Sequence, residues 1–85
     1  MSRPSERETR RWLAALGAAV RDRRAALGIS QETLGYRSGL DRTYVSGVER
    51  GRRNPTVVAL FKLASGLEIS IGELILTAEE QVAKR

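Results

Sequence analysis

Thirteen of the fifteen cationic residues in this sequence are Arg. Arginine therefore dominates what the chain can bind through positive charge. A guanidinium group donates paired hydrogen bonds to a phosphate or to the edge of a guanine base. The net charge of +5 divides unevenly, with +4 over residues 1–24, +2 over residues 25–53 and −1 over residues 54–85. This excess favours a polyanionic partner such as a nucleic acid. A solvated surface in a protein from a GC-rich genome explains it equally well, so charge alone leaves both interpretations open.

Several other chemistries are excluded by composition. The chain has no Cys and no His, which rules out disulfides, the usual zinc sites, thiol nucleophiles and histidine acid–base catalysis. Glu79 and Glu80 are adjacent in a segment expected at the surface, and we interpret them as solvated charge. We therefore expect no enzymatic activity, no cofactor and no metal site.

The stretch from Gln31 to Arg50 has the pattern of two short helices joined by a tight turn. Gly39 suits a turn position of positive φ, and Asp41 can cap the second helix. Gly35 removes a side chain where the two helices have to cross. The inner faces are Leu34, Gly35 and Ser38 in the first helix, and Val45, Val48 and Glu49 in the second. This arrangement is a helix-turn-helix, whose second helix is usually laid in a DNA major groove.

Residues 16–75 resemble the DNA-binding domain of the lambda-repressor/Cro family, also called the XRE family. The matching elements follow in order: Arg21 and Arg24 before Gly28, Ser30-Gln31, the Gly35/Gly39 spacing, Tyr44-Val45-Ser46, Glu49-Arg50-Gly51, Asn54-Pro55, and Leu63-Ala64 before Leu67. The resemblance implies an all-α, compact five-helix lambda-repressor-like domain that binds double-stranded DNA. Within the family, the run from Leu40 to Arg50 looks most like the controller proteins of restriction–modification systems.

The flanking sequence predicts three further helices. The first has an apolar stripe of Leu13, Leu16, Val20 and Leu27, and it ends at Gly28. The fourth is capped by Thr56, with Val57, Leu60, Leu63, Ala64 and Leu67 inward, and the fifth is capped by Ser70 and carries Ile71, Leu74 and Ile75. No strand pattern is present.

The expected domain organisation is one small domain with two short extensions. We place the helix-turn-helix domain at residues 9–76, a flexible tail at residues 1–8 and a C-terminal extension at residues 77–85. A capping-box pattern at Ser5 and Glu8 allows the first helix to begin as early as Glu6. Thr77 either caps a short final helix or lies in a frayed end, and the sequence leaves that choice open.

Arg24 falls in the middle of the apolar stripe, where an unpaired charge is costly to bury. Glu49 lies on the inward side of the second helix of the motif, beside Val45 and Val48. We predict an Arg24–Glu49 ion pair that supports the fold, and the family resemblance implies the same pairing.

The outward face of the second helix provides the candidates for reading DNA bases. With about 100° of rotation per residue, Thr43, Ser46, Gly47 and Arg50 face away from the core. Arg42 lies in the first turn, and N-terminal residues of a recognition helix are the ones that reach base edges. We predict base contacts from Arg42, Thr43, Ser46 and Gly47. Gly47 either allows close approach of the backbone to a thymine methyl group or reads nothing.

Phosphate contacts are expected from both ends of the motif. Gln31 combines an amide donor with the positive end of a helix dipole. The resemblance implies backbone contacts just beyond the recognition helix. The full set of candidates is Gln31, Arg37, Tyr44, Arg50, Arg52, Arg53 and Asn54. Tyr44 is almost equally suited to packing on a neighbouring helix, and Arg52 and Arg53 also fit a solvated loop.

The last helices carry more apolar residues than one small core can accept. Leu74, Leu76 and Val82 are our candidates for a two-fold interface, although single exposed leucines are ordinary on protein surfaces. We expect a cytoplasmic homodimer that regulates transcription at a pseudo-palindromic operator, with no effector domain and no membrane association. The alternative is a protein-interaction module of the same fold, such as an antitoxin or an adaptor.

Overall fold

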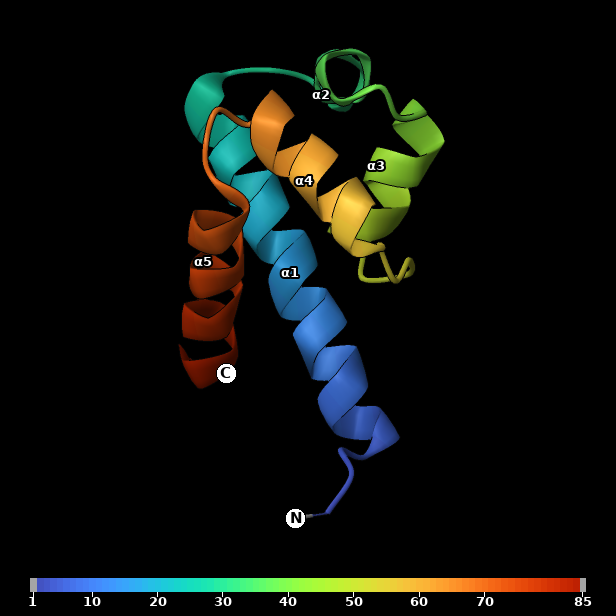
Figure 1. The fold of residues 1–85 in the computed structure, drawn as a ribbon, viewed down its shortest axis with the longest axis vertical. Helices are drawn as coiled ribbons and strands as arrows, with labels where there is room; N and C mark the ends of the chain where they lie inside the picture. Colours follow the sequence, from blue (N-terminus) through green and yellow to red (C-terminus); the bar gives the residue numbers. More distant parts are fainter. Residues whose placement is uncertain (1, 85) are drawn as a thin grey trace.

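The structure, a computed structural model, describes residues 2–84 and contains five α-helices within that range. They are α1 (Glu6–Leu27), α2 (Gln31–Ser38), α3 (Arg42–Glu49), α4 (Val57–Gly66) and α5 (Ile71–Lys84), and no strand is found among the described residues (Figure 1). The all-α prediction with five helices is confirmed. No helix within residues 2–84 has the length and apolar character needed to cross a membrane.

Local chemistry fixes where the helices begin and end. Ser5 and Glu8 form a reciprocal capping box, in which each side chain accepts from the other residue's backbone N–H at 3.1 Å. The hydroxyl groups of Ser30, Thr56 and Ser70 each accept a hydrogen bond from a backbone N–H in the first turn of α2, α4 and α5, respectively.

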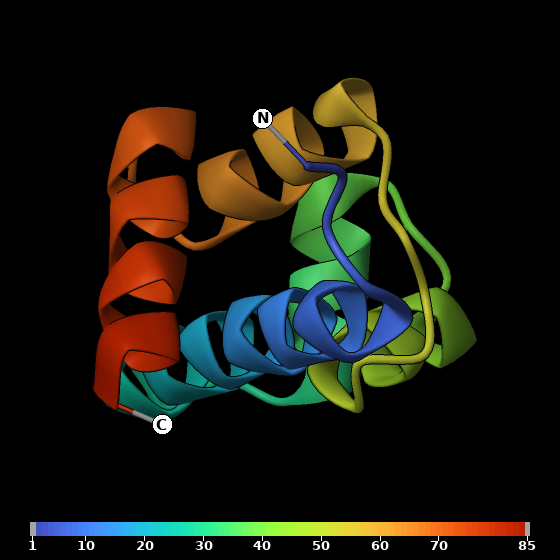
Figure 2. The ribbon, with the colours of Figure 1, turned by 90° about the horizontal axis from the view of Figure 1, so that it is seen from below.

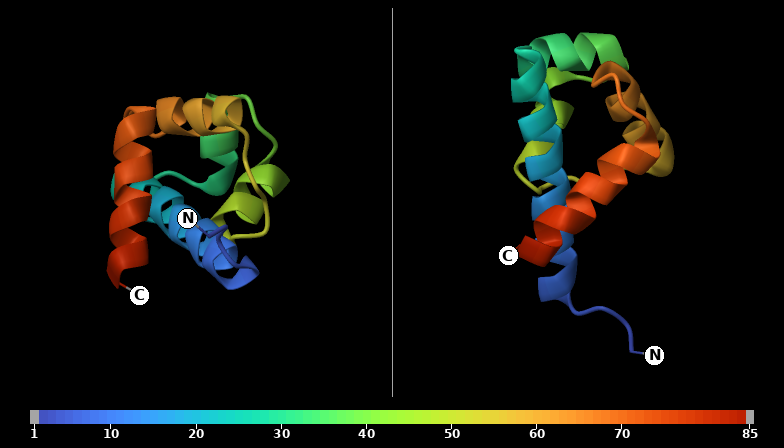
Figure 3. Two further views of the ribbon diagram at one scale, coloured as in Figure 1. Left: turned by 60° about the horizontal axis from the view of Figure 1, so that its bottom comes forward. Right: turned by 90° about the vertical axis from the view of Figure 1, so that its left-hand side faces the viewer.

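α1 runs through the molecule, and α5 packs along it (Figures 1 and 3). α2 and α4 pack together, and α3 contacts both α1 and α2. Seen from below, α1 runs across the lower half of the view, with α5 at the left and α4 at the top (Figure 2). The first turns of α1 extend beyond the other helices, which gives the molecule its 39 Å long axis. α1 is therefore the common support for α3 and α5.

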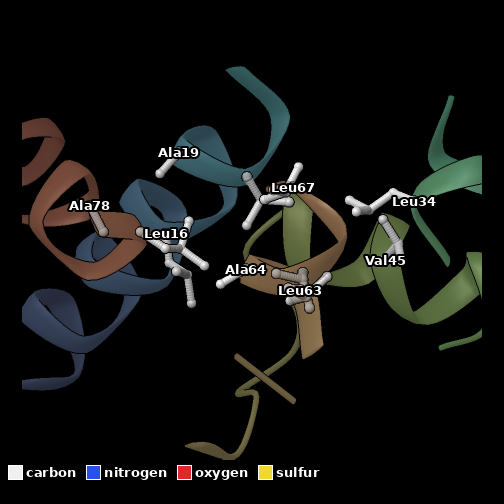
Figure 4. Close-up of a cluster of buried hydrophobic side chains, with 11 residues drawn as sticks. Leu16, Ala19, Leu34, Val45, Leu63, Ala64, Leu67 and Ala78 are labelled. Carbon is white, nitrogen blue, oxygen red and sulfur yellow. The ribbon is translucent and has the colours of Figure 1, made fainter. Parts of the chain in front are cut away.

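The core is a single cluster to which all five helices contribute (Figure 4). Leu34 of α2, Val45 of α3 and Leu63 of α4 are fully buried, and Leu16 of α1 and Ala78 of α5 lie at the other end of the cluster. Small residues dominate the α1 contribution, since Ala15, Ala18 and Ala19 are all buried. They allow the neighbouring helices to approach α1 closely.

Three details differ from the sequence predictions. Residues 6–8 belong to α1, so the predicted tail is shorter than expected, and Met1 and Arg85 lie outside the described residues. α5 continues through Thr77 to Lys84, and the Thr77 hydroxyl donates to the Glu73 carbonyl at 2.9 Å, so Thr77 neither caps a separate helix nor lies in a frayed end. Val57 was expected inside but is 73% exposed, and Ala59 takes the buried position in this part of α4.

Candidate nucleic-acid interface

The turn between α2 and α3 brings the two helices into backbone contact. Gly39 has φ of 68°, which a glycine adopts without steric cost. A Cβ atom on Gly35 would lie 2.6 Å from the Leu40 carbonyl oxygen, so only a glycine fits there without a shift. Asp41 occupies the N-cap position of α3 but its side chain makes no capping hydrogen bond, contrary to the sequence prediction. The carboxylate of Asp41 is therefore not what starts α3.

Arg24 and Glu49 form the predicted ion pair. Arg24 Nε lies 2.6 Å from Glu49 Oε2, and the Arg24 terminal nitrogen Nη2 lies 3.0 Å from Oε1. A third hydrogen bond joins Arg24 Nη1 to the Ile29 carbonyl at 3.0 Å. The hydrogen bond to Glu49 raises the pKa of Arg24 above its ordinary value, and partial burial opposes this effect. Arg24 therefore stays charged at every physiological pH and ties α1 to the end of α3.

α1 also supports α3 through direct backbone packing. A Cβ atom on Gly17 would lie 2.5 Å from the carbonyl oxygens of both Val48 and Glu49. The last turn of α3 therefore rests on a position of α1 that has no side chain. Sequence reasoning missed this contact, although a glycine among the buried alanines of a helical stripe was the available signal.

The outer side of α3 carries the side chains that were predicted to reach bases. Arg42 and Thr43 are exposed in its first turn, and Arg50 is exposed directly after its last residue. Ser46 is half-buried, and its carbonyl accepts a 3.4 Å hydrogen bond from Arg50 Nε. Arg42 and Thr43 at the start of α3 and Arg50 just beyond its end are thus open to solvent, and Ser46 is partly so, as a reading surface requires.

Gly47 was also predicted on this side, but it is buried, because the side chain of Arg53 crosses over it. The Arg53 guanidinium lies over the Tyr44 ring, with its carbon 5.5 Å from the ring centroid. Tyr44 is half-buried and packs against the core. The packing interpretation of Tyr44 is therefore the one that the structure favours, and Gly47 does not present its backbone to solvent.

The predicted phosphate-binding residues have different surroundings. The Gln31 amide donates to Glu49 Oε1 at 3.0 Å, so this side chain is engaged in the Arg24–Glu49 network. Arg37 forms an exposed ion pair with Glu68 at 3.1 Å. Arg52 and Asn54 are exposed in the loop after α3, and the Arg52 backbone N–H donates to the Gly47 carbonyl at 2.8 Å. The loop arginines are thus held close to the end of α3.

The candidate interface residues do not form one surface. Leu74 is fully buried in the core of the single chain, so its assignment to an interface is wrong: the i, i+4 pair of Leu74 and Ala78 is the face of α5 that packs on the core. Leu76 is 57% exposed, and Val82 is half-buried. A separate apolar hollow is lined by Trp12, Leu13, Leu16, Pro55, Leu60 and Ile75, together with polar groups of the α1 start and Asn54.

Comparisons with known proteins agree with this architecture. An uncharacterised HTH-type transcriptional regulator of Sinorhizobium fredii is 47% identical over 53 residues, which cover 62% of this chain and 69% of the relative. The control protein C.MunI of a Mycoplasma species is 39% identical over 59 residues, covering 69% of this chain and 80% of the relative.

The likeness extends to solved structures. The restriction–modification controller protein C.AhdI from Aeromonas hydrophila superimposes with a TM-score of 0.72 at 53% identity, over 73% of this chain and 94% of that protein. The family model described as helix-turn-helix matches residues 20–74, which hold all of α2, α3 and α4. The chain belongs to this XRE-type helix-turn-helix family.

Proposed function

We propose that this protein is a transcriptional regulator that binds double-stranded DNA sequence-specifically, as a homodimer on a pseudo-palindromic operator, in the cytoplasm. The observation that carries the proposal is the outer side of α3, where Arg42 and Thr43 are exposed in the first turn and Arg50 follows the last. A helix of this kind enters the major groove with its N-terminal side chains towards the bases.

The chemistry of these side chains suits the two tasks of a DNA-binding surface. Arg42 has the reach and the paired donors to bind guanine O6 and N7, and Thr43 offers a methyl group to thymine or a hydroxyl to a base. Ser46 is short enough for a base edge or a bridging water. Arg50, Arg52 and Asn54 are suited to phosphates at the end of α3, and Gln31 is suited to phosphates at the start of α2. Arg37 is a weaker candidate because Glu68 already holds it.

The homodimer is supported by apolar side chains that α5 and α1 leave accessible to solvent. Leu76 is exposed next to Ile75, which lines the hollow between α1, the loop after α3 and α5. Trp12, also in the wall of that hollow, is 37% exposed. A two-fold partner that covers Leu76 and Val82 would remove this apolar surface from water. Two copies of α3 would then face half-sites about one helical turn, or about 34 Å, apart.

Within this class we assign the protein to the controllers of restriction–modification systems. The assignment is supported by two kinds of similarity, one to the control protein C.MunI and one to the solved controller C.AhdI. A relative named only as a transcriptional regulator is also similar to the chain, so the operator itself has to decide between the subclasses. An operator upstream of restriction–modification genes would support the assignment.

The deciding experiment is selection of bound duplexes from a random DNA pool at near-physiological salt, with the stoichiometry of the winning complex measured by sedimentation. An enriched palindrome bound by two chains is the expected result. Enrichment of one half-site bound by a single chain would contradict the dimer and leave sequence-specific binding intact. Weak, salt-sensitive binding without enrichment would contradict the proposal and favour the alternative, a helix-turn-helix used for protein contacts.

A further inference from the structure

We propose that Arg53 is a base-reading residue, and that Gly47 is the slot in α3 that lets it reach the major groove. The inference rests on the proposed DNA-binding function and deepens it, because it changes how the recognition surface is composed. Arg53 lies outside α3, in the loop that follows, where a phosphate contact was the expectation. Its side chain instead returns across the outer side of the helix.

The geometry of the slot is set by the missing Cβ of Gly47. A Cβ atom there would lie 2.7 Å from Arg53 Cγ, 3.3 Å from its Nε and 3.5 Å from its Cδ. The methylene stem of Arg53 therefore lies directly on the α3 backbone, and any larger residue would lift it off. Because Gly47 falls on the side of α3 opposite to Val45 and Val48, the stem crosses the side of the helix that faces a groove.

Tyr44 supports the other end of the side chain. The Arg53 guanidinium carbon is 5.5 Å from the centroid of the Tyr44 ring, and Tyr44 is itself packed against the core. A cation over an aromatic face uses the flat side of the guanidinium, and its N–H donors stay free at the edge. Arg53 forms no ion pair with a carboxylate of residues 2–84. The paired donors that bind guanine O6 and N7 are thus not taken up by a carboxylate, and the side chain is supported at two points, by the Gly47 backbone and by the Tyr44 ring.

This arrangement favours a base over a phosphate as the ligand. A phosphate contact needs only charge and reach, which the exposed neighbouring Arg52 provides. A base contact needs a donor pair held in one place, and holding it before binding removes ordering costs that a free side chain would incur on binding. α3 presents no side chain of its own at position 47, and Arg53 supplies one there from outside the helix.

The test uses the full chain with four single substitutions: Gly47→Ala, Arg53→Ala, Arg52→Ala and, as a matched glycine control, Gly72→Ala. A Cβ on Gly72 in α5 would meet only Ser70 Oγ, at 3.8 Å. Each variant is put through the same DNA selection, and the base preference at each operator position is measured together with the salt dependence of binding. Thermal melting checks that each variant is folded.

The expected result is one G·C position whose preference, about 10- to 100-fold in the unsubstituted protein, is lost in both Arg53→Ala and Gly47→Ala. Gly47→Ala keeps every charge, so its salt slope should equal that of the unsubstituted protein, which a simple phosphate role cannot explain. Gly72→Ala should keep the full preference. Gly47→Ala should melt no lower than the unsubstituted protein, because the displaced group is a flexible side chain.

Three results would overturn the inference while leaving the proposed function intact. The first is an unchanged base preference in Gly47→Ala. The second is an equal loss of affinity for all sequences in Arg53→Ala, with a lower salt slope like that of Arg52→Ala, which would make Arg53 a phosphate contact. The third is a large drop in the melting temperature of Gly47→Ala. Failure of the proposed function is recognised separately, because the unsubstituted protein would then enrich no sequence at all.

Discussion

Arg24 and Glu49 meet at two points, Nε to Oε2 at 2.6 Å and Nη2 to Oε1 at 3.0 Å, and the Glu49 side chain is only 3% exposed. Gln31 adds a third donor to the same carboxylate. One buried acid at the end of α3 therefore joins α1, α2 and α3. The orientation of the proposed recognition helix depends on this one charge being paired.

Removal of the Glu49 carboxylate should destabilise the domain strongly. Glu49→Ala leaves Arg24 partly buried without its partner, and we expect a loss of about 3–5 kcal/mol in the free energy of unfolding. Denaturant titration followed by circular dichroism measures it. Glu68→Ala, which removes the exposed partner of Arg37, is the matched control and should change stability by at most about 1 kcal/mol. Equal, small effects in both variants would show that the buried pair contributes no more than a surface pair.

A side chain added at Gly17 should also destabilise the domain. A Cβ there meets the Val48 and Glu49 carbonyl oxygens, which are backbone atoms that cannot rotate away. We expect Gly17→Ala to lower the free energy of unfolding by about 2–3 kcal/mol and the melting temperature by more than about 8 °C. Gly72→Ala, on the exposed side of α5, should be neutral or slightly stabilising. If Gly17→Ala had the same melting temperature as the unsubstituted protein, α1 and α3 would have to move apart at little cost.

Truncation of Arg42 and truncation of Arg52 should weaken DNA binding in different ways. Arg42→Ala should relax the preference at one base position and weaken the best operator by about 1–3 kcal/mol. Arg52→Ala should weaken all sequences about equally and reduce the slope of log affinity against log salt by about one. Titrations of the selected operator and of a scrambled duplex at several salt concentrations separate the two behaviours. Identical profiles for the two variants would refute our division of these arginines into base and phosphate contacts.

A charge at Leu76 should separate the proposed dimer without unfolding its chains. Because Leu76 is 57% exposed in the single chain, Leu76→Asp should leave each helix in place and raise the dimer dissociation constant at least about tenfold, equivalent to about 1.4 kcal/mol. Analytical ultracentrifugation and circular dichroism test the two statements together. Leu74→Asp, two residues earlier and about half a turn away on α5, should instead unfold the chain, since Leu74 is fully buried. Ala26→Asp, on the exposed end of α1, is the control for added negative charge; a dimer unaffected by Leu76→Asp would place the interface elsewhere.

The features that follow local chemistry could be predicted from the sequence. Gly39 needs its positive φ whatever surrounds it, and Ser30 and Thr56 cap helices through atoms only three residues away. The Arg24–Glu49 pair was also predictable, because both residues fall on the apolar faces of their helices. A charged side chain on such a face is costly to bury unless an oppositely charged side chain pairs with it.

The features that depend on tertiary contact could not be read in this way. Helical periodicity puts Gly47 on the outer side of α3, but it does not reveal that Arg53 returns from a loop to cover it. Periodicity likewise sets Leu74 and Leu76 about 200° apart on α5, but it does not tell which of the two faces the core. In the structure Leu74 and Ala78 are buried, and Leu76 is 57% exposed. Val57 opens α4 in the predicted apolar stripe, but it is 73% exposed in the structure.

The unbroken length of α1 limits how this chain can vary. Its contacts come at fixed turns of one helix, with Gly17 beneath α3 and Arg24 at Glu49. One residue inserted between them would rotate the rest of α1 by about 100° relative to Gly17 and shift it by about 1.5 Å. The Arg24 guanidinium would then no longer meet the Glu49 carboxylate. Insertions and deletions should therefore be absent between these two positions in functional relatives, and differences in length should collect in the loops and at the ends of the chain.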